Sequence, residues 1–563
     1  MSAAPSAVHS LWTLADSSST IGSIKPPTIE YAQLSPMLVL FGAAALGILV
    51  EAFVPRRARY WTQVGLALAG LTGSFVAIVV LAADGYAGSK AHLAAMGAVA
   101  VDGPALFLQG TIVLISVVSV LGFAERRLES PRAAGRGLLR GWTGAPVDSF
   151  APQAAAVPGS DAEKSAVRSG FATTEVFPLT MFAVVGMLLF PASGDLLTMF
   201  VALEVFSLPL YLLCALARRR RLLSQEAAVK YFLLGAFSSA FFLFGLALIY
   251  GYAGTVSLSG IAAVVSGTES PVTPALANTT GNDALLLIGL AMLGVGLLFK
   301  VGAVPFHAWT PDVYQGAPTP VTGFMAAATK VAAFGALLRL LYVAFPGLTW
   351  DFRPVMWGVA ILTMVVGSII AVTQTDVKRL LAYSSIAHAG FILTGVIAMN
   401  QAGISAVLFY LGAYSFVTLG AFAVVTLVRD AGGEATHLSR WAGLGRRSPV
   451  LAATFALFLL AFAGIPLTSG FAGKFAVFQA AAEGGATPLV IVGVLSSAVA
   501  AFFYIRVIVL MFFSDPRPDG PTVAVPSVFT GTAIVLGVAV TLVLGILPQY
   551  FLHLASQASV FVH

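Results

Sequence analysis

Fourteen stretches of about 20 mostly apolar residues follow one another along the chain. Each is long enough to cross the hydrocarbon core of a bilayer as a helix. Only 10% of the 563 residues are charged, against roughly 25% in ordinary globular proteins. We therefore predict an all-α, polytopic membrane protein, and the composition excludes a soluble enzyme, a nucleic-acid binder and a disordered scaffold. The predicted spans are 34–54, 62–82, 104–123, 175–193, 194–216, 226–252, 283–306, 319–345, 354–374, 377–400, 402–428, 448–483, 487–513 and 525–547.

The basic residues divide unevenly between the loops on the two sides of the predicted membrane. Of the 30 Lys and Arg, 21 lie in one set of alternate loops, and three, Lys25, Lys90 and Arg353, lie in the opposite set. Loops rich in Lys and Arg stay in the cytoplasm. An even number of spans puts both termini on one side, so we predict that both termini are extracytoplasmic.

The spans and loops divide the chain into six predicted segments. The long loop between the third and fourth spans carries seven basic residues, and it is either a docking arm for a neighbouring protein or a solvated linker. The segments are an extracytoplasmic N-terminal segment (1–33), spans 1–3 (34–123), the cytoplasmic basic loop (124–174), a first repeat of spans 4–8 (175–345), a second repeat of spans 9–13 (354–513) and span 14 (525–547).

Ionisable side chains inside the spans need an explanation, because each costs about 2.5–3.5 kcal/mol or more at the membrane centre. Arg339 and Arg506 lie near span ends, where we expect their long side chains to reach water. Glu204 lies in the middle of its span, and Lys230 lies about one turn into the next span. These two side chains are close enough to pair if the two helices are neighbours.

Three further lysines, Lys300, Lys330 and Lys474, lie deep in their spans. An amine held out of water can lose its proton near neutral pH, and a nearby carboxylate restores the charge. That exchange is the physical requirement for a proton relay. The alternative is a structural role, in which each amine donates hydrogen bonds to backbone carbonyls.

Two spans contain helix breakers next to these lysines. Pro305 cannot donate to the carbonyl of Val301, and Pro466 leaves the carbonyl of Phe462 free. Such backbone is tolerated at membrane depth only where protein or water satisfies it. The breaks fall five spans apart, which predicts two inverted five-helix repeats containing broken helices 7 and 12. The predicted breakers are Pro305, Gly464, Pro466 and Gly470.

Histidines and cysteine limit the other chemistry that the chain can carry. His307 follows the first break directly, and we expect it to shuttle protons between lysines, since imidazole titrates near neutral pH. His388 and Tyr383 are either accessory relay groups or satisfied core residues. The single cysteine, Cys214, leaves no ligand set for an iron–sulfur cluster or structural zinc. We therefore expect no metal site and no cofactor site in this chain.

Three sequence runs carry a resemblance to a known family. The runs are VPFHAWTPDVYQGAPTPV at 304–321, TDVKRLLAYSSIAH at 375–388 and GIPLTSGF at 464–471. They resemble subunit N of the proton-pumping NADH–quinone oxidoreductase, respiratory complex I. The resemblance implies two half-channels for protons joined across the midplane. It further implies that Glu204 modulates the charge of a neighbouring lysine, that Lys230, Lys300, His307 and Lys330 form the input and connecting relay, and that Lys474 gates the exit.

The resemblance also implies where the remaining chemistry takes place. NADH, FMN, iron–sulfur clusters and quinone are expected in partner subunits, and this chain is expected in a bacterial plasma membrane beside other membrane-arm subunits and lipids. The main alternative is a subunit of a multi-subunit monovalent cation/proton antiporter, which would exchange sodium without any NADH-oxidising partner. A haem-carrying quinone cytochrome is disfavoured because only two histidines lie at depth, 81 residues apart.

Overall fold

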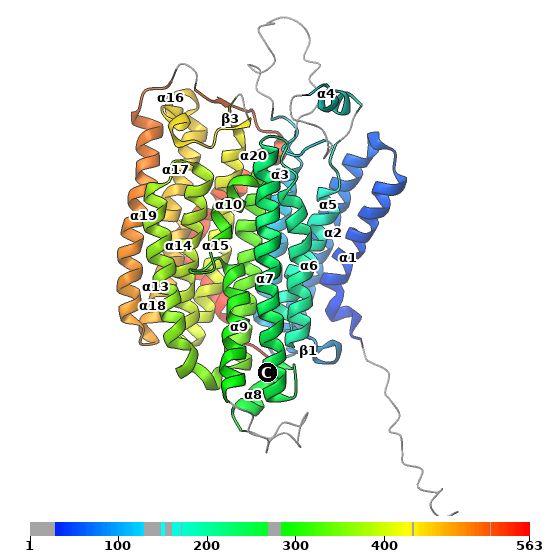
Figure 1. Ribbon diagram of the computed structural model, residues 1–563, viewed down its shortest axis with the longest axis vertical. Helices are drawn as coiled ribbons and strands as arrows, with labels where there is room; N and C mark the ends of the chain where they lie inside the picture. Colours follow the sequence, from blue (N-terminus) through cyan, green and yellow to red (C-terminus); the bar gives the residue numbers. More distant parts are fainter. Residues whose placement is uncertain are drawn as a thin grey trace, which may run out of the picture.

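The computed structural model describes residues 29–128, 148–152, 160–169, 172–267, 283–430, 433–517 and 520–562. Most of the predicted N-terminal segment, the middle of the basic loop and residues 268–282 lie outside the described residues. Long helices stand side by side in one bundle (Figure 1). Within the described residues, twelve helices are long and apolar enough to cross a membrane, so the prediction of an all-α membrane protein is confirmed.

Every predicted span overlaps a helix, and the span 448–483 is divided between two helices as expected. Two apolar helices, Val176–Ala192 and Pro449–Ala463, are shorter than a full span, and the count of fourteen spans stays a prediction. The main helices are α1 (Tyr31–Phe53), α2 (Arg56–Leu81), α3 (Gly103–Phe123), α5 (Val176–Leu189), α6 (Leu196–Cys214), α7 (Arg221–Ala253), α9 (Asp283–Val301), α10 (Trp309–Gly316), α11 (Thr319–Phe324), α12 (Lys330–Arg339), α13 (Thr349–Thr373), α14 (Val377–Ile397), α15 (Gln401–Leu427), α17 (Pro449–Ala463), α18 (Ser469–Glu483), α19 (Thr487–Phe513) and α20 (Val528–Ile546).

Short elements lie at the two ends of the bundle. They are the helices α4 (Asp161–Arg168), α8 (Leu258–Val265), α16 (Leu444–Arg447) and α21 (Pro548–Gln557), and the strands β1 (His92–Ala94), β2 (Val99–Val101), β3 (Val428–Asp430), β4 (Gly433–Glu434) and β5 (Thr522–Val523). The strands β1 and β2 pair antiparallel, with His92 opposite Val101. In the second small sheet, β3 lies between β4 and β5.

The centre of the bundle is formed by α11–α12, α14 and α15. A π-helical turn joins α11 to α12, and all residues in the most apolar 18-residue stretch of this continuous helix are buried. In the corresponding stretches of α14 and α15, 94% and 83% of the residues are buried, whereas in α19 the share is 33%. Helices that are apolar on all sides favour such central positions. Most of the lysines predicted for the relay lie on or against these central helices.

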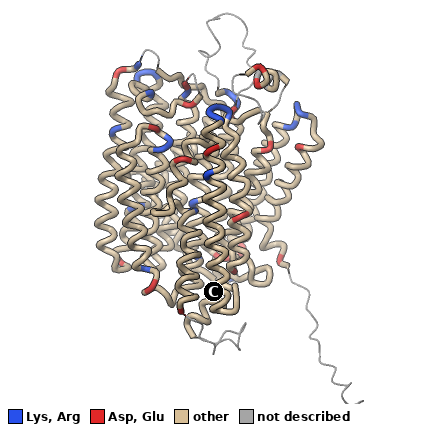
Figure 2. Tube along the Cα trace, viewed as in Figure 1, with Lys and Arg blue, Asp and Glu red and all other residues tan. Residues whose placement is uncertain are grey.

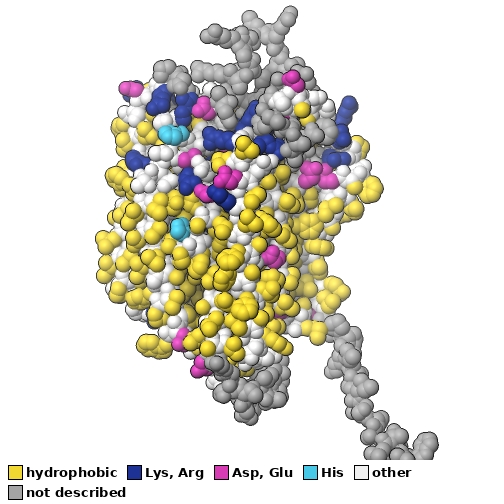
Figure 3. All heavy atoms as spheres, viewed as in Figure 1, with side chains coloured by type: hydrophobic (Ala, Val, Ile, Leu, Met, Phe, Trp, Pro, Cys, Tyr) yellow, Lys and Arg dark blue, Asp and Glu magenta, His cyan; other side chains and the backbone are white. Residues whose placement is uncertain are grey.

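Lysine and arginine gather at one end of the bundle. Figure 2 shows them around α16, β3 and the turn between α1 and α2, which we call the basic end. The middle of the visible surface is largely hydrophobic (Figure 3). The start of α1 and the C-terminal residues both lie at the opposite end (Figure 1). This charge distribution follows the split that the sequence predicts between the two sets of loops.

Arg339 does not reach water, contrary to expectation. Its side chain is 1% exposed, and its Nη2 lies 2.7 Å from Oδ1 of Asp102. Its Nε donates to the carbonyl of Pro191 at 2.6 Å, and the other carboxylate oxygen of Asp102 accepts from the amide of Val562 at 3.0 Å. Arg339 therefore satisfies its charge inside the protein, with a carboxylate that caps α3. Arg506, by contrast, is exposed and donates to two carbonyls at the C-terminal end of α13.

The described parts of the basic loop pack against the turn between α6 and α7. The amide of Ala151 donates to the carbonyl of Leu216 at 2.9 Å, and the amide of Arg218 donates to the carbonyl of Ser149 at 3.0 Å. Nε of Arg218 lies 3.1 Å from the carboxylate of Glu163 in α4. These residues are therefore docked on the bundle, and the interpretation as a solvated linker is wrong for this part of the loop.

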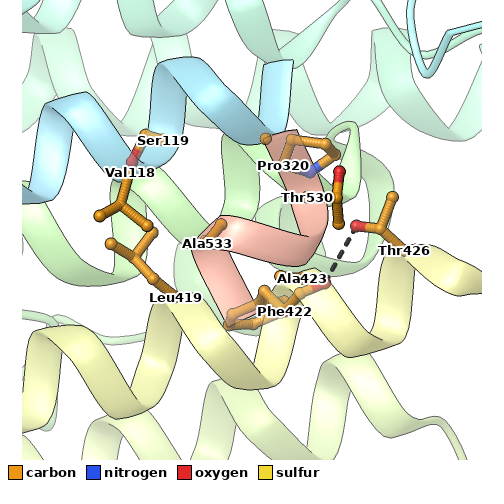
Figure 4. Close-up of a pocket in the computed structure, with 11 residues that line it drawn as sticks. Val118, Ser119, Pro320, Leu419, Phe422, Ala423, Thr426, Thr530 and Ala533 are labelled. Carbon is orange, nitrogen blue, oxygen red and sulfur yellow. Dashed lines mark hydrogen bonds between the residues drawn. The ribbon is translucent and has the colours of Figure 1, made fainter. Parts of the chain in front are cut away.

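A small cavity of about 20 Å³ lies where α3, α11, α15 and α20 meet (Figure 4). Apolar side chains and threonines line it, and Thr426 donates to the carbonyl of Phe422 at 2.9 Å. The hydroxyl of Thr530 is buried there without a hydrogen-bond partner in the described part of the chain. Because the cavity has room for a single water and contains no ionisable side chain, it is a packing feature that lies apart from the lysines.

Docking of the basic loop should depend on pH. Burial raises the pKa of Asp148 to about 6, although the nearby Arg218 guanidinium opposes the shift. The docked segment therefore binds the proton more tightly than an exposed aspartate, and docking weakens as pH rises through that value. We expect the amide hydrogens of Ala151 and Arg218 to exchange with deuterium more slowly near pH 5 than near pH 8, after correction for intrinsic rates. Asp148→Asn should remove this difference, and equal protection of the unmodified chain at both pH values would contradict the prediction.

Candidate functional site

The two helix breaks have the same backbone geometry. Gly302 ends α9 with φ +78°, and Gly464 ends α17 with φ +83°, a left-handed conformation that glycine adopts without strain. The amides of Gly302 and Ala303 donate to the carbonyls of Phe299 and Leu298, and Gly464 and its successor bond Ala461 and Leu460 in the same way. Both helices thus end in the same hydrogen-bonded cap, which repeats the architecture of one break in the other.

Lysine amines take up the carbonyls that these breaks leave free. Nζ of Lys330 donates to the carbonyl of Val301 at 3.3 Å and to that of Ser385 at 2.5 Å. Nζ of Lys474 donates to the carbonyls of Phe462 at 2.9 Å and Ala463 at 3.0 Å, and to the hydroxyl of Ser497 at 2.8 Å. Protein groups therefore satisfy both freed carbonyls that the sequence identifies.

Two details of the predicted breaks need correction. The amine at the first break belongs to Lys330 of α12 and not to the sequence-adjacent Lys300. Gly470 does not interrupt the second span, because it lies in the first turn of α18. A side chain at Gly470 would collide with the carbonyl oxygen of Ala461, so this glycine allows the two half-helices to approach closely. Pro305 and Pro466 lie within the breaks as predicted.

Lys300 is buried in a cage of aromatic rings. Its side chain is 2% exposed, and Nζ donates to the hydroxyl of Ser207 on α6 at 2.8 Å. The amine lies 5.2–5.9 Å from the ring centroids of Phe206, Tyr211, Tyr231 and Phe299. Aromatic faces stabilise a cation within about 6 Å, and this cage accepts the protonated amine without a carboxylate in contact.

The pair expected between Glu204 and Lys230 does not form. Nζ of Lys230 lies 2.7 Å from Glu226 and 2.8 Å from Asp312, and Asp312 also binds Arg379 at 2.7 Å. Lys230 is partly exposed, and it turns toward these nearer carboxylates. Glu204 is half-buried with one carboxylate oxygen unpartnered in the described part of the chain. Ser207, one helical turn further along α6, accepts a hydrogen bond from Nζ of Lys300 at 2.8 Å, so Glu204 lies near the caged amine of Lys300.

His388 lies between the lysines of the two breaks. Its ring is 2% exposed, its Nδ1 is 2.7 Å from the hydroxyl of Tyr410, and its Nε2 is 3.4 Å from that of Tyr504. The ring of Tyr414 lies 5.1 Å from His388 and 5.8 Å from Nζ of Lys330. The ring of Phe391 lies 5.6 Å from His388 and 4.8 Å from Nζ of Lys474.

His307 and Tyr383 lie outside this arrangement. His307 is half-buried on the connection between α9 and α10, next to the exposed Pro305. Its Nδ1 has no hydrogen-bond partner among the described residues. Tyr383 is half-buried on α14 and directly precedes the buried Ser384 and Ser385. The structure thus brings Lys330, His388 and Lys474 together and leaves His307 nearer the surface.

The three deep lysines share an electrostatic character that Lys230 lacks. Lys300, Lys330 and Lys474 are 2%, 3% and 5% exposed, and within the described ranges none of them forms an ion pair. Their amines donate to hydroxyl and carbonyl oxygens, which accept from a neutral amine as well as from a charged one. These amines can therefore change protonation without breaking an ion pair, whereas Lys230 is bound by two carboxylates.

Unpartnered polar atoms occur beside the caged amine. Within the described residues, the Tyr231 hydroxyl, the Thr310 hydroxyl and one Glu204 oxygen are buried without hydrogen bonds. Buried polar groups in proteins are nearly always bonded to protein or ordered water. Tyr231 belongs to the aromatic cage of Lys300, and Glu204 lies one turn before Ser207, which accepts from the amine, so two of these polar atoms lie near Lys300.

Several site residues escaped the sequence analysis. In the sequence, Asp312 is only one residue of the motif at 304–321, and nothing in that motif indicates that it links Lys230 to Arg379. Tyr410, Tyr414 and Tyr504 are spread over two helices and showed no local signal. The sequence of α14 does carry a signal, because serines and a histidine fall at helical spacing (384, 385 and 388) in the middle of a mostly apolar span. Among the described residues, no group of three or more His, Cys, Asp or Glu could hold a metal ion.

Comparisons with known proteins identify a family and close relatives of this chain. Residues 193–500 match the family described as NADH:quinone oxidoreductase/Mrp antiporter, TM. NADH-quinone oxidoreductase subunit N 3 of Streptomyces griseus is 72% identical over 559 residues, covering 99% of each chain. NADH-quinone oxidoreductase subunit N of Rhodococcus opacus is 68% identical, covering 96% of this chain and 97% of the relative.

Two solved structures have the same fold. A chain of respiratory complex I from Thermus thermophilus with bound aureothin is 32% identical, with a TM-score of 0.69 over 92% of this chain and 99% of that chain. A chain of the Mrp complex from Dietzia sp. has a TM-score of 0.74, with 94% and 97% coverage, but only 21% identity. The second likeness concerns the fold alone.

Removing the caged amine should cost less stability than removing the carboxylate of Asp312. Lys300→Met replaces an amine without an ion pair by an apolar side chain of similar size, so we expect an unchanged or raised Tm. Asp312→Asn leaves Lys230 and Arg379 without their shared carboxylate. Because these side chains are partly exposed and Lys230 keeps Glu226, we expect a loss of about 0.2–1 kcal/mol. Tryptophan fluorescence during thermal unfolding in detergent measures both. A larger loss for Lys300→Met than for Asp312→Asn would assign Lys300 a structural role.

Proposed function

The chain belongs to the subunit N family of NADH-quinone oxidoreductase, within the larger NADH:quinone oxidoreductase/Mrp antiporter family, and from that premise we propose that its buried lysines carry protons across the membrane arm. It is a membrane subunit of an enzyme complex, and its partners are other membrane-arm subunits. The observation that carries the proposal is the burial of Lys300, Lys330 and Lys474 without a carboxylate partner.

The proposed relay runs through Lys300, Lys330, His388 and Lys474. Glu204 and the aromatic cage set the charge of Lys300, and the two broken helices supply carbonyl acceptors for the next two amines. His388, hydrogen-bonded by two tyrosines, connects the lysines of the two breaks. Because a neutral imidazole can accept a proton at one nitrogen and release it at the other, it suits a transfer between two amines.

The roles of Lys230 and His307 differ from those implied by the resemblance. Lys230 is bound by Glu226 and Asp312, which favours the charged amine in every step. We assign it to the charge cluster that holds α7, α10 and α14 together rather than to proton transfer. His307, half-buried beside the first break, is assigned a peripheral role. In this proposal His388 replaces it as the connecting imidazole.

The energy for transport would come from electron transfer in partner subunits. A shift in a carboxylate such as Glu204 changes the cost of a charge on Lys300, and one proton moved across 100 mV requires about 2.3 kcal/mol. NADH, FMN, iron–sulfur clusters and quinone are assigned to those partners. No specific observation favours the cation/proton antiporter alternative, because the likeness to the Mrp complex is a likeness of fold.

We further propose that the basic end faces the cytoplasm of a bacterium and that both termini are extracytoplasmic. The gathering of Lys and Arg at that end supports this orientation (Figure 2), because positively charged segments are retained in the cytoplasm. The C-terminal residues lie at the opposite end (Figure 1). Protons would then travel from the basic end through the relay to the opposite end.

Replacing His388 should stop proton transport, whereas replacing His307 should not. In inverted membrane vesicles energised with NADH, we expect His388→Leu to lower the rate of acidification about a hundredfold or more, as lost proton-transfer groups do (~10²–10⁴-fold). His307→Leu should change it less than about twofold, because this ring lies outside the network. NADH oxidation and the amount of assembled complex are measured in parallel. Normal pumping by His388→Leu together with loss in His307→Leu would reverse the assignment.

Lys330 provides a sharper control, since arginine keeps the charge but does not release its proton. Lys330→Arg should therefore pump as poorly as Lys330→Met, within about twofold, in the same vesicles. Pumping near the unmodified rate in Lys330→Arg would indicate a fixed structural charge and would refute the relay.

Single cysteines can test the orientation. Cys214 is buried, whereas Lys90 and Arg517 are exposed at opposite ends of the bundle. In intact cells, an impermeant maleimide should label Lys90→Cys and leave Arg517→Cys unlabelled until the cells are opened. The reverse labelling pattern would show that the basic end is outside.

A further inference from the structure

A large cleft opens at the basic end between α2, α5, the end of α6 and the described parts of the loop that follows α3. Its volume is about 720 Å³, within the range of ~300–1,000 Å³ typical of small-molecule sites. Four arginines, Arg56, Arg57, Arg59 and Arg126, and one carboxylate, that of Glu175, line it among the described residues. The cleft therefore carries a net positive charge at the level where the helices leave the membrane.

The arginines of the cleft are held by different contacts. Arg59 lies 3.2 Å from Glu51 and donates to the carbonyl of Val54, so it is anchored to the end of α1. The guanidinium of Arg126 lies 4.2 Å from the centroid of the Tyr60 ring, which fixes its plane. Nε of Arg126 is buried and has no hydrogen-bond partner in the described part of the chain. A buried donor without an acceptor is costly, and an anion in the cleft would satisfy it.

The floor of the cleft is apolar and continues to the lipid-facing surface. Leu179 of α5, Leu212 of α6 and Leu216 of the turn after α6 line it, and Leu212 is 58% exposed on the outside of the bundle. A ligand can therefore place a charged group among the arginines and an apolar chain against the leucines. That combination of a charged head and an apolar tail is the chemistry of a membrane lipid.

We propose that this cleft binds one anionic phospholipid of the cytoplasmic leaflet, with its phosphate among Arg57 and Arg126 and an acyl chain along Leu179 and Leu212. Basic pockets between transmembrane helices on the cytoplasmic side bind anionic head groups, and arginine matches phosphate with paired donors. The apolar floor open to the bilayer distinguishes a lipid from free phosphate. The site is independent of the proposed relay, since none of its residues belongs to it.

Photocrosslinking in the assembled complex tests the proposal. Leu212 is replaced by p-benzoylphenylalanine, and the complex is reconstituted in vesicles of phosphatidylcholine containing phosphatidylglycerol. Mass spectrometry of the crosslinked chain then gives the ratio of anionic to neutral lipid adducts. We expect enrichment of phosphatidylglycerol over its share in the vesicle, and a fall in this enrichment of about fivefold for each arginine removed in Arg57→Gln and Arg126→Gln.

The matched control removes two arginines from elsewhere at the basic end. Arg446→Gln with Arg517→Gln changes the net charge equally but lies outside the cleft, and it should leave the enrichment unchanged. The control is compared with the variant that combines Arg57→Gln and Arg126→Gln. If both variants lower the enrichment equally, or if lipid adducts form in proportion to the vesicle composition, the proposal is overturned. A crosslink to a neighbouring subunit in place of lipid, or full competition by inorganic phosphate, would also overturn it. Proton pumping measured on the same variants separates this outcome from failure of the relay.

Discussion

The structure depends on hydrogen bonds between buried lysine amines and free backbone carbonyls. Each such bond satisfies two polar groups that the apolar layer cannot solvate. Two helices break at membrane depth, and each break exposes carbonyl oxygens that hydrocarbon cannot solvate. Lys330 and Lys474 bring amines that are equally costly to leave without partners. Each group offsets the cost of the other. An amine bonded only to carbonyl and hydroxyl oxygens is not held in its charged form by an ion pair, so the contact that stabilises the break also permits proton exchange.

The contrast with the paired cations explains why only some buried charges suit transport. Arg339 is as buried as the relay lysines, yet it is joined to Asp102, whose other oxygen holds the C-terminal segment. Lys230 likewise sits between two carboxylates. Removing the partner of the buried Arg339 costs several kcal/mol, whereas the partly exposed pairs of Lys230 contribute about 1 kcal/mol or less. Both kinds of pair favour the charged side chain, which suits them to holding helices together. The charged amine of Lys300 is stabilised by its aromatic cage and the nearby Glu204, but among the described residues it forms no ion pair that would prevent loss of the proton.

Arginines at the basic end serve a different purpose from the lysines at depth. Several bind carboxylates and dock the described parts of the loop between α3 and α5 onto the α6–α7 turn. Others surround a cleft whose floor faces the lipid. The charge asymmetry that orients the chain in the membrane therefore also provides local contacts at the membrane surface, one set with its own loop and, as we propose, another with an anionic lipid.

The sequence by itself determined the apolar spans, the breaks at Pro305 and Pro466, the lysines at depth and the uneven distribution of basic residues, because each follows from local composition or from the missing amide of proline. The tertiary structure decided the partners. It paired Lys230 with Asp312 instead of Glu204, brought Lys330 to the first break in place of Lys300, buried Arg339 against Asp102, and put His388 rather than His307 between two lysines. Spans that are apolar on every side do not reveal their rotation or neighbours in the sequence, and those two properties select which distant side chains meet.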